Sequence, residues 1–166
     1  LSLPKLEALD REYPGRVRTV AATRETIEAY TVRADLLVGA VLVPGAAAPR
    51  LVDRDLVARM KPGSVIVDVA IDQGGCVETS RPTTHADPTY VVDGVIHYGV
   101  ANMPGAVPRT SAQALNNATR PFVLALADKG WEKATAEDPH LSRGLNVSAG
   151  HIVHPVVAAA LAREIS

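Results

Sequence analysis

Two uninterrupted apolar runs constrain the fold more than any other feature of this sequence. Residues 35–43 read Asp-Leu-Leu-Val-Gly-Ala-Val-Leu-Val, and residues 64–71 read Ser-Val-Ile-Val-Asp-Val-Ala-Ile. Neither run shows the regular polar alternation of a strand with one wet face. Runs of this length, followed by glycine-containing turns, are typical of strands covered on both faces, as in a parallel sheet.

Helical segments alternate with these strands. Leucines at helical spacing predict a short helix over residues 2–12. Thr23 is a good N-cap for a helix over 24–33, and Asp53 is a possible cap within a helical segment at 51–60.

Shorter strand signals complete the pattern. Residues 16–20 are rich in β-branched side chains, and Asp93-Gly94 predicts a hairpin between strands at 90–92 and 95–100. Strands that alternate with helices through short connections favour right-handed crossovers. We therefore expect an α/β fold with a partial Rossmann-like, doubly wound parallel sheet.

The pattern changes after Pro108. Residues 110–129 predict one long helix, and shorter helices follow around 131–136 and at 155–163. The expected organisation is a sheet-bearing portion over residues 1–108, followed by a helical tail over 109–166.

Composition argues against several functional classes. Lys and Arg number 17 against 18 Asp and Glu, so the net charge of −1 gives no reason to expect nucleic acid or a membrane as partner. The single cysteine, Cys76, excludes an internal disulfide and reads as a small buried hydrophobe. We expect a reducing cytoplasm and, because an initiator methionine is lacking, a chain that begins within a longer one.

Asp72 is the most informative candidate for function. It directly follows the second apolar run and precedes Gly74 and Gly75, at the end of a strand where open α/β sheets bind ligands. A carboxylate there could bond a ribose hydroxyl, orient an ammonium group or assist proton transfer, or it could simply be a turn aspartate. Asp68, inside the strand, is expected to be structural.

Other polar side chains carry weaker signals. Arg81 suits a diphosphate, although a solvated arginine or an ion pair is the commoner fate. His151 and His154 could meet on one helical turn, but no carboxylate or cysteine stands at ligand spacing, so no metal site is expected.

Because Gly-x-Gly occurs nowhere, the dinucleotide-binding fingerprint is absent from the chain.

Five segments occur in a fixed order and spacing along the chain: Val38-Gly-Ala-Val-Leu-Val-Pro-Gly45, Met60-Lys-Pro-Gly63, Val67-Asp-Val-Ala-Ile-Asp-Gln-Gly-Gly75, Ser80-Arg-Pro-Thr-Thr84 and Val100-Ala-Asn-Met-Pro104. In this order they resemble the alanine dehydrogenases, and the similarity extends from about Gly15 to beyond Asn146. The resemblance implies NAD as cofactor and reversible oxidative deamination of L-alanine to pyruvate and ammonia. It also implies that residues 1–108 are the carboxyl-terminal part of an NAD-binding Rossmann domain and that residues 109–166 return to a substrate domain.

The same resemblance implies roles for individual residues. Asp72 matches the catalytic aspartate, and Arg81 matches a residue that approaches the cofactor phosphates. The other cofactor-binding positions that it implies are Val41, Leu42, Val69, Ala70, Ile71, Val100, Ala101, Asn102 and Met103, with Asp72 among them. Where the family often has a serine in the cofactor pocket, this sequence has Ala21-Ala22.

The resemblance also defines what this chain lacks. The lysine and histidine that bind pyruvate belong to the family's amino-terminal domain, so the expected partners are that missing half and further copies in an oligomer. We expect the chain to be inactive alone. Two alternatives stay open: the NAD(H)-binding subunit of a proton-translocating transhydrogenase, which tends to have glutamate where this chain has Asp72, and a non-catalytic oligomerisation module.

Overall fold

The computed structural model describes residues 2–43 and 47–164, which form two compact units. The first unit comprises the described residues up to Leu42 together with Ala48–Ala101, and the second includes the residues from Asn102 onward.

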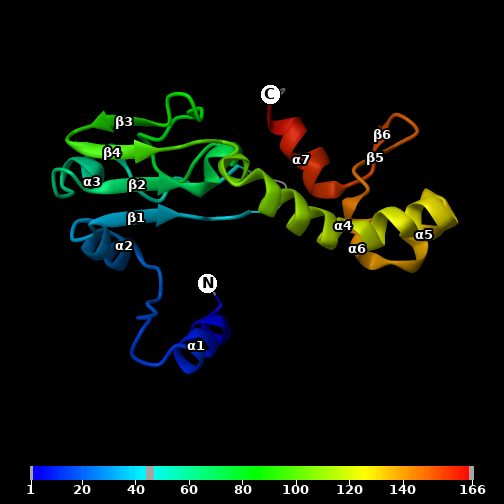
Figure 1. Ribbon diagram of the computed structural model, residues 1–166, viewed down its shortest axis with the longest axis horizontal. Coiled ribbons are helices and arrows are strands. Elements are labelled where there is room, and N and C mark those ends of the chain that lie inside the picture. The colour runs from blue at the N-terminus through cyan, green and yellow to red at the C-terminus, as the bar shows by residue number, and fades with distance from the viewer. Residues whose placement is uncertain (1, 44–46, 165–166) are drawn as a thin grey trace. The chain divides into compact units, whose positions relative to one another are not determined.

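A four-stranded sheet organises the first unit, with strand order β1-β2-β4-β3 (Figure 1). The strands are β1 (Leu36–Gly39), β2 (Val65–Asp68), β3 (Thr89–Val92) and β4 (Val95–Tyr98). β1, β2 and β4 are parallel, and β3 pairs antiparallel with β4. The predicted α/β fold with a parallel sheet is confirmed.

Local signals located the helices and the hairpin of this unit correctly. Its helices are α1 (Leu3–Glu12), α2 (Arg24–Thr31) and α3 (Arg54–Ala58). Thr23 caps α2 in a capping box with Thr26, and Asp53 accepts a 2.8 Å hydrogen bond from the backbone N–H of Leu56 in α3. The β3–β4 turn places Asp93 and Gly94 at φ of 50° and 79°, the left-handed conformation of a tight hairpin.

The strand predicted at residues 16–20 is wrong. The backbone N–H groups of Arg16 and Val17 donate to the carbonyl oxygen of Tyr13, and the chain then runs without regular structure to Thr23. A strand forms only against a neighbouring strand, and within the described residues none pairs with this segment. The β-branched side chains of residues 16–20 therefore do not lead to a strand.

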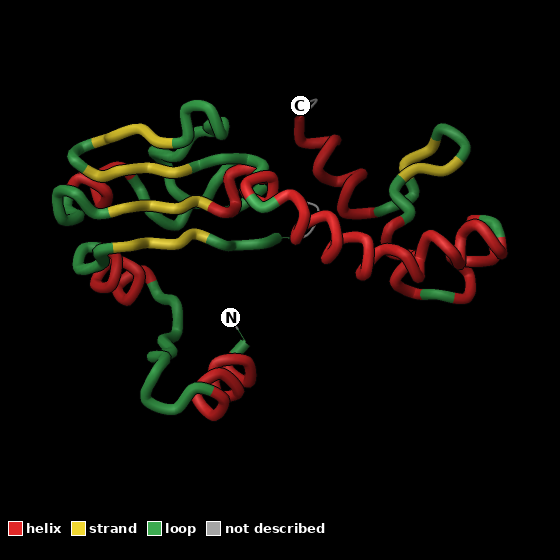
Figure 2. The backbone as a smooth tube through the Cα atoms, in the orientation of Figure 1, coloured by secondary structure: helices red, strands yellow, loops and turns green. Residues whose placement is uncertain are grey.

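The predicted strand at 64–71 is shorter than expected. β2 ends at Asp68, and Val69–Gln73 form a 3-10 helix, η1 (Figure 2). The first run is likewise a strand only over β1, and Pro44 and Gly45 at its predicted end lie outside the described residues.

Only one face of the sheet is well covered, contrary to the expectation for β1. The core on the covered face includes Ile66 of β2, Val95 of β4, and Leu56 and Val57 of α3. On the opposite face Leu36 and Val38 of β1 are 59% and 54% exposed. The side chains on both faces of β1 are apolar, but the described residues cover only one of these faces.

The second unit is mainly helical. It contains η2 (Met103–Ala106), α4 (Pro108–Lys129), α5 (Trp131–Glu137), α6 (Pro139–Gly144) and α7 (Pro155–Glu164), with a two-stranded sheet of β5 (Val147–Ser148) and β6 (His151–Ile152). The long helix and the last helix agree with the sequence pattern, whereas α6 and the β5–β6 sheet were not predicted. No residue of α4 is buried.

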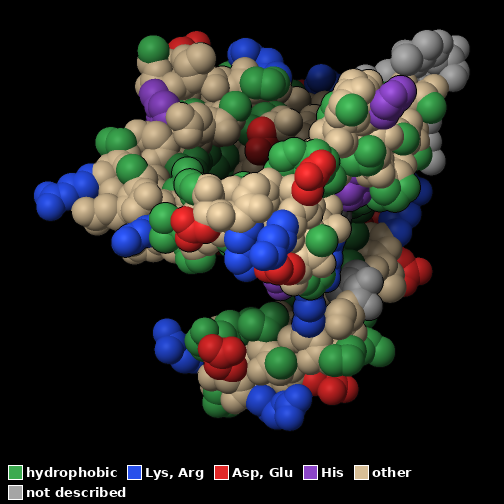
Figure 3. Space-filling view, turned by 90° about the vertical axis from the view of Figure 1, so that its right-hand side faces the viewer, with side chains coloured by type: hydrophobic (Ala, Val, Ile, Leu, Met, Phe, Trp, Pro, Cys, Tyr) green, Lys and Arg blue, Asp and Glu red, His purple; other side chains and the backbone are tan. Residues whose placement is uncertain are grey.

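Apolar side chains therefore reach the surface of both units. In space-filling view, hydrophobic side chains lie among charged ones rather than wholly beneath them (Figure 3). Among the described residues, no helix combines the length and the apolar character that a membrane span requires.

Candidate functional site

The carboxyl ends of β1, β2 and β4 lie at one edge of the sheet, as the parallel arrows in Figure 1 show. This is the edge at which open α/β sheets bind ligands. Three segments leave it within the first unit: residues 40–42 after β1, residues 69–75 after β2, and residues 99–101 after β4.

Asp68 fixes the path of the segment after β2. Its buried carboxylate accepts hydrogen bonds from the backbone N–H groups of Cys76 and Val77, with Oδ2 at 3.0 and 3.1 Å. The expectation that Asp68 is structural is confirmed. Since it ends β2 and binds the far end of the loop, the residues between are held in a closed turn.

Cys76 is buried in this turn, as predicted, and its Sγ lies 3.5 Å from Asp68 Oδ1. Burial first, then the negative charge of Asp68 and the hydrogen bond to it, raise the pKa of the Cys76 thiol to about 11. The thiol is therefore protonated near neutral pH and acts as a packing and hydrogen-bonding group.

Gly75 is required by this turn. Its φ is 76°, and a Cβ on it would lie 2.9 Å from Asp68 Oδ2 and 3.3 Å from Cδ1 of Ile71. Gly74 also has a positive φ, 93°, but a Cβ there would meet open space. The glycine pair therefore closes the turn beneath Asp72, with Gly75 packed on the Asp68 carboxylate.

η1 presents its residues in two directions. Asp72 is exposed, and its side chain makes no hydrogen bond or ion pair with another described residue. Val69 is 46% exposed, whereas Ala70 and Ile71 are buried in the first unit. The side chains of Asp72 and Val69 thus face solvent, whereas the carbonyl oxygens of Ala70 and Ile71 accept hydrogen bonds from Gly75 and Gly74 within the turn.

A second segment, residues 79–83, is attached alongside the end of β4. The backbone N–H of Thr83 donates to the carbonyl oxygen of Gly99 at 2.9 Å, and Thr83 pairs with Val100 as a parallel bridge. A Cβ on Gly99 would lie 2.6 Å from the carbonyl oxygen of Arg81 and 3.4 Å from Cγ1 of Ile71. Gly99 thereby allows the Arg81 segment and η1 to meet at the end of β4.

Arg81 extends from this junction over an aromatic ring. Its Cζ is 4.1 Å from the centroid of the Tyr90 ring, and its guanidinium forms no ion pair with a carboxylate in the part of the chain that the structure describes. Arg81 and Ile71 are thus brought together with Val100, which is buried, and Ala101, which is exposed.

Tyr90 and His97 were not among the predicted site residues. They face each other across β3 and β4, with ring centroids 5.1 Å apart and planes at 23°. The signal in the sequence is two rings placed symmetrically about the Asp93-Gly94 turn, which identifies a cross-strand pair once the hairpin is accepted.

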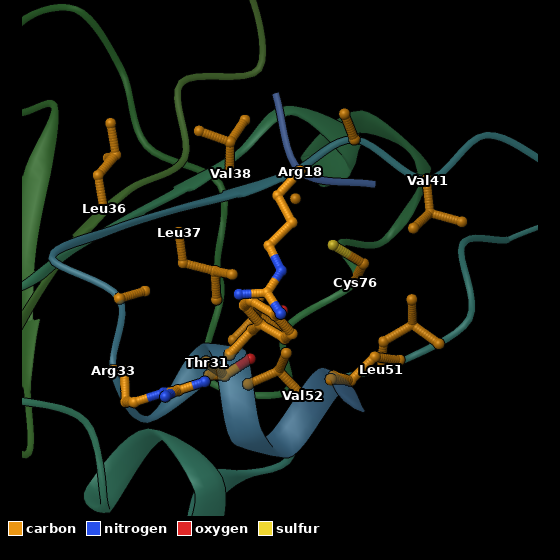
Figure 4. A pocket seen from close by; sticks show the side chains of 16 residues that line it. Arg18, Thr31, Arg33, Leu36, Leu37, Val38, Val41, Leu51, Val52 and Cys76 are labelled. Atoms are coloured by element: carbon orange, nitrogen blue, oxygen red, sulfur yellow. The ribbon is translucent and has the colours of Figure 1, made fainter. Parts of the chain in front are cut away.

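The segment after β1 borders an apolar hollow of about 680 Å³ (Figure 4). Val41 lines it, together with Leu37 of β1, Thr31 of α2 and the buried Cys76, while Arg18 enters from the irregular segment. Leu42 follows and is 68% exposed.

Asn102 and Met103 belong to the second unit, where the carbonyl oxygen of Asn102 accepts from the backbone N–H of Gly105 at the start of η2. They continue directly from Ala101 along the chain.

Among residues 2–43 and 47–164, no group of three or more His, Cys, Asp or Glu side chains could hold a metal ion.

The parallel sheet with its carboxylate and guanidinium at the carboxyl edge defines a Rossmann-like α/β ligand-binding unit. Comparison with known protein families agrees with this class, since the family model described as "Alanine dehydrogenase/PNT, C-terminal domain" matches residues 1–155. The chain therefore belongs to the alanine dehydrogenase/PNT family, and the family resemblance seen in the sequence is confirmed.

Two alanine dehydrogenases are more similar to this chain than a solved transhydrogenase is. The chain is 64% identical to an alanine dehydrogenase of Halomonas elongata over 163 residues, covering 98% of this chain and 44% of that protein. A solved L-alanine dehydrogenase is 52% identical with a TM-score of 0.83, covering 98% of this chain and 45% of that one. A transhydrogenase from Sinorhizobium meliloti is more distant, at 26% identity and a TM-score of 0.60, covering 81% of this chain and 36% of that one. The chain spans less than half the length of these proteins.

Proposed function

We propose that this chain is the carboxyl-terminal portion of an NAD-dependent alanine dehydrogenase, which deaminates L-alanine oxidatively to pyruvate and ammonia and catalyses the reverse reaction. The observation that carries the proposal is the closed turn over residues 69–75, which presents an exposed, unpaired Asp72 at the carboxyl edge of a parallel sheet. Bound NAD would supply the hydride acceptor, and the residues of this chain would bind and orient it.

The side chains at this edge fit part of such a cofactor. The guanidinium of Arg81 has no carboxylate partner among the described residues, so it is available to a diphosphate. Val69 offers exposed apolar surface beside Asp72, which suits a nicotinamide ring. Val41, Leu42, Ala70, Ile71 and Val100–Met103 complete the cofactor contacts that we propose.

Asp72 is the proposed catalytic residue. An exposed carboxylate can hold an ammonium group or accept a proton at its Oδ atoms. Because the turn that contains η1 is held closed by the contacts of Asp68 and Gly75, the Asp72 carboxylate lies on a short, fixed turn rather than on a long loop.

The remaining contacts would come from outside this chain. We propose that residues 1–108 complete a nucleotide-binding domain, that residues 109–166 return to a substrate domain, and that an amino-terminal half binds L-alanine or pyruvate. The exposed apolar face at Leu36 and Val38 supports such a partner, since it needs cover. Assembly into a homo-oligomer in the cytoplasm completes the proposal.

The isolated chain is expected to be inactive. Losing three or four cofactor hydrogen bonds at about 1 kcal/mol each removes roughly 4 kcal/mol, about a thousandfold in affinity. A micromolar NAD site would become millimolar.

The test is complementation. Residues 1–166 are mixed with, or fused to, the amino-terminal portion of the Halomonas elongata relative, and NAD binding and alanine oxidation are measured. Activity on complementation, lost in Asp72→Asn and kept in the exposed control Asp87→Asn, is expected. Turnover of alanine by residues 1–166 alone, or full activity in Asp72→Asn, would contradict the proposal.

A transhydrogenase subunit is the second candidate, because the family description covers both kinds of protein and one solved transhydrogenase is similar. It predicts NADH binding in the fused protein without deamination of alanine. An oligomerisation module predicts association without NAD binding under either condition.

A further inference from the structure

The ring of Tyr90 contacts two side chains of the first unit, His97 and Arg81. His97 of β4 is buried, Tyr90 of β3 stacks on it with ring centroids 5.1 Å apart, and the Arg81 guanidinium lies over the Tyr90 ring, 4.1 Å from its centroid. Neither aromatic residue has a part in the function proposed above.

A chain of hydrogen bonds runs beside this stack. His97 Nδ1 lies 3.0 Å from the carbonyl oxygen of Val95, which can only accept, so Nδ1 carries the proton. Nε2 of His97 therefore accepts from the hydroxyl of Thr79 at 2.7 Å. Burial lowers the pKa of His97, which favours this neutral form.

Tyr90 continues the chain to the backbone of Arg81. Its hydroxyl donates to the carbonyl oxygen of Thr79 at 2.9 Å and accepts from the backbone N–H of Arg81 at 2.7 Å. Burial is also the largest influence on the Tyr90 hydroxyl and raises its pKa, so it keeps the proton that it donates.

We propose that Tyr90, stacked on His97, is a positioning residue for Arg81: its hydroxyl fixes the backbone of Arg81 and its ring supports the guanidinium. This inference rests on the proposed contact between Arg81 and the cofactor phosphates. Both parts of Arg81 are held by one side chain, which comes from the hairpin at the edge of the sheet. The rotamer of an exposed arginine is thereby restricted before a ligand arrives, which reduces the entropy lost on binding.

A double-mutant cycle separates positioning from general packing. The complete enzyme is obtained by fusing the amino-terminal portion of the Halomonas elongata relative to residues 1–166. Dissociation constants for NADH are measured by fluorescence, with KM for NAD, KM for alanine and kcat, in Tyr90→Phe, Tyr90→Leu, Arg81→Ala and the double variants. Tyr98→Leu is the matched control, because Tyr98 is also half-buried but lies on the opposite face of the sheet.

Tyr90→Leu is expected to weaken NADH binding about fivefold to tenfold, with kcat and KM for alanine within about twofold, since Arg81 loses both its hydrogen bond to the Tyr90 hydroxyl and its cation–π contact with the ring. Tyr90→Phe, which keeps the ring, is expected to fall between Tyr90→Leu and the parent. In the Arg81→Ala background, Tyr90→Leu is expected to have no further effect. Tyr98→Leu is expected to leave NADH binding unchanged.

Each contrary outcome has its own meaning. If Arg81→Ala weakens NADH binding but Tyr90→Leu does not, or if the two effects simply add, positioning by Tyr90 is overturned while the role of Arg81 stands. If Arg81→Ala has no effect on NADH binding, the proposed phosphate contact fails and the positioning role fails with it.

Discussion

The carboxylate of Asp68 binds Cys76 twice, through the backbone N–H at 3.0 Å from Oδ2 and through Sγ at 3.5 Å from Oδ1. The end of β2 is thereby joined to the residue that follows the glycine pair. Everything between them, including the proposed catalytic Asp72, is a short closed turn whose geometry depends on this contact.

The first prediction concerns the thiol in this contact. Because its pKa is raised from 9.0 to about 11, the thiolate fraction of Cys76 at pH 8 is expected to be about a hundredfold lower than in the unfolded chain. Alkylation by iodoacetamide at pH 8 should therefore be slow in buffer and fast in denaturing urea. A Cys76→Ala chain carrying Ala86→Cys, an exposed position, is the control and should react rapidly in both; equal rates for Cys76 in both conditions would contradict a buried thiol.

The second prediction compares two neighbouring glycines. Gly75→Ala must adopt a left-handed φ and also displace the Asp68 carboxylate, so we expect a loss of about 3 kcal/mol in the free energy of unfolding. Gly74→Ala meets only the backbone penalty and should cost about 1 kcal/mol. Urea denaturation measures both, and equal losses would show that Gly75 is not packed on Asp68.

The third prediction concerns pH. The pKa of His97 is lowered on folding, so its contribution to stability is complete above the ordinary value of 6.5 and is lost as the pH falls through the lowered value. The midpoint temperature of thermal unfolding should decrease as the pH is lowered from 7.5 to 5.5, and His97→Phe should make this decrease smaller. The exposed His140→Gln is the control; an unchanged pH dependence in His97→Phe would exclude His97 as its source.

The fourth prediction concerns the exposed face of β1. Leu36→Lys and Val38→Lys replace exposed apolar side chains, so they should reduce self-association of the isolated chain with less than about 0.5 kcal/mol change in stability. Leu37→Lys, on the covered face against the core, should cost about 2–4 kcal/mol instead. Sedimentation and thermal unfolding measure the two effects, and persistent association in the double variant Leu36→Lys/Val38→Lys would place the contact elsewhere.

What the sequence predicts well is what its local chemistry determines. Thr23, Asp53 and the Asp93-Gly94 turn each act on residues within a few positions, so their roles were evident before the structure. The buried, hydrogen-bonded Asp68 followed from a carboxylate inside an apolar run.

What the sequence does not predict depends on distant partners. Residues 16–20 have strand composition without a strand to join, and Leu36 and Val38 have apolar character without cover among the described residues. The 3-10 turn at Val69–Gln73 is apolar at its start, so periodicity could not separate it from the end of the strand. The Tyr90–His97 stack depends on the β3–β4 register, which follows from the two-residue turn only once the hairpin itself is accepted.

The contacts that hold Arg81 and the Asp72 turn have a further consequence for the order of folding. They join residues that are close along the chain: Asp68 to Cys76 across 8 positions, Arg81 to Tyr90 across 9, and Thr79 to His97 across 18. Short loops close at low entropic cost and favour early contacts, whereas pairing Leu36 with Val65 closes a longer one. During synthesis, the chain from β2 to β4 is therefore expected to become ordered as one local nucleus, to which β1 and whatever covers it are added afterwards.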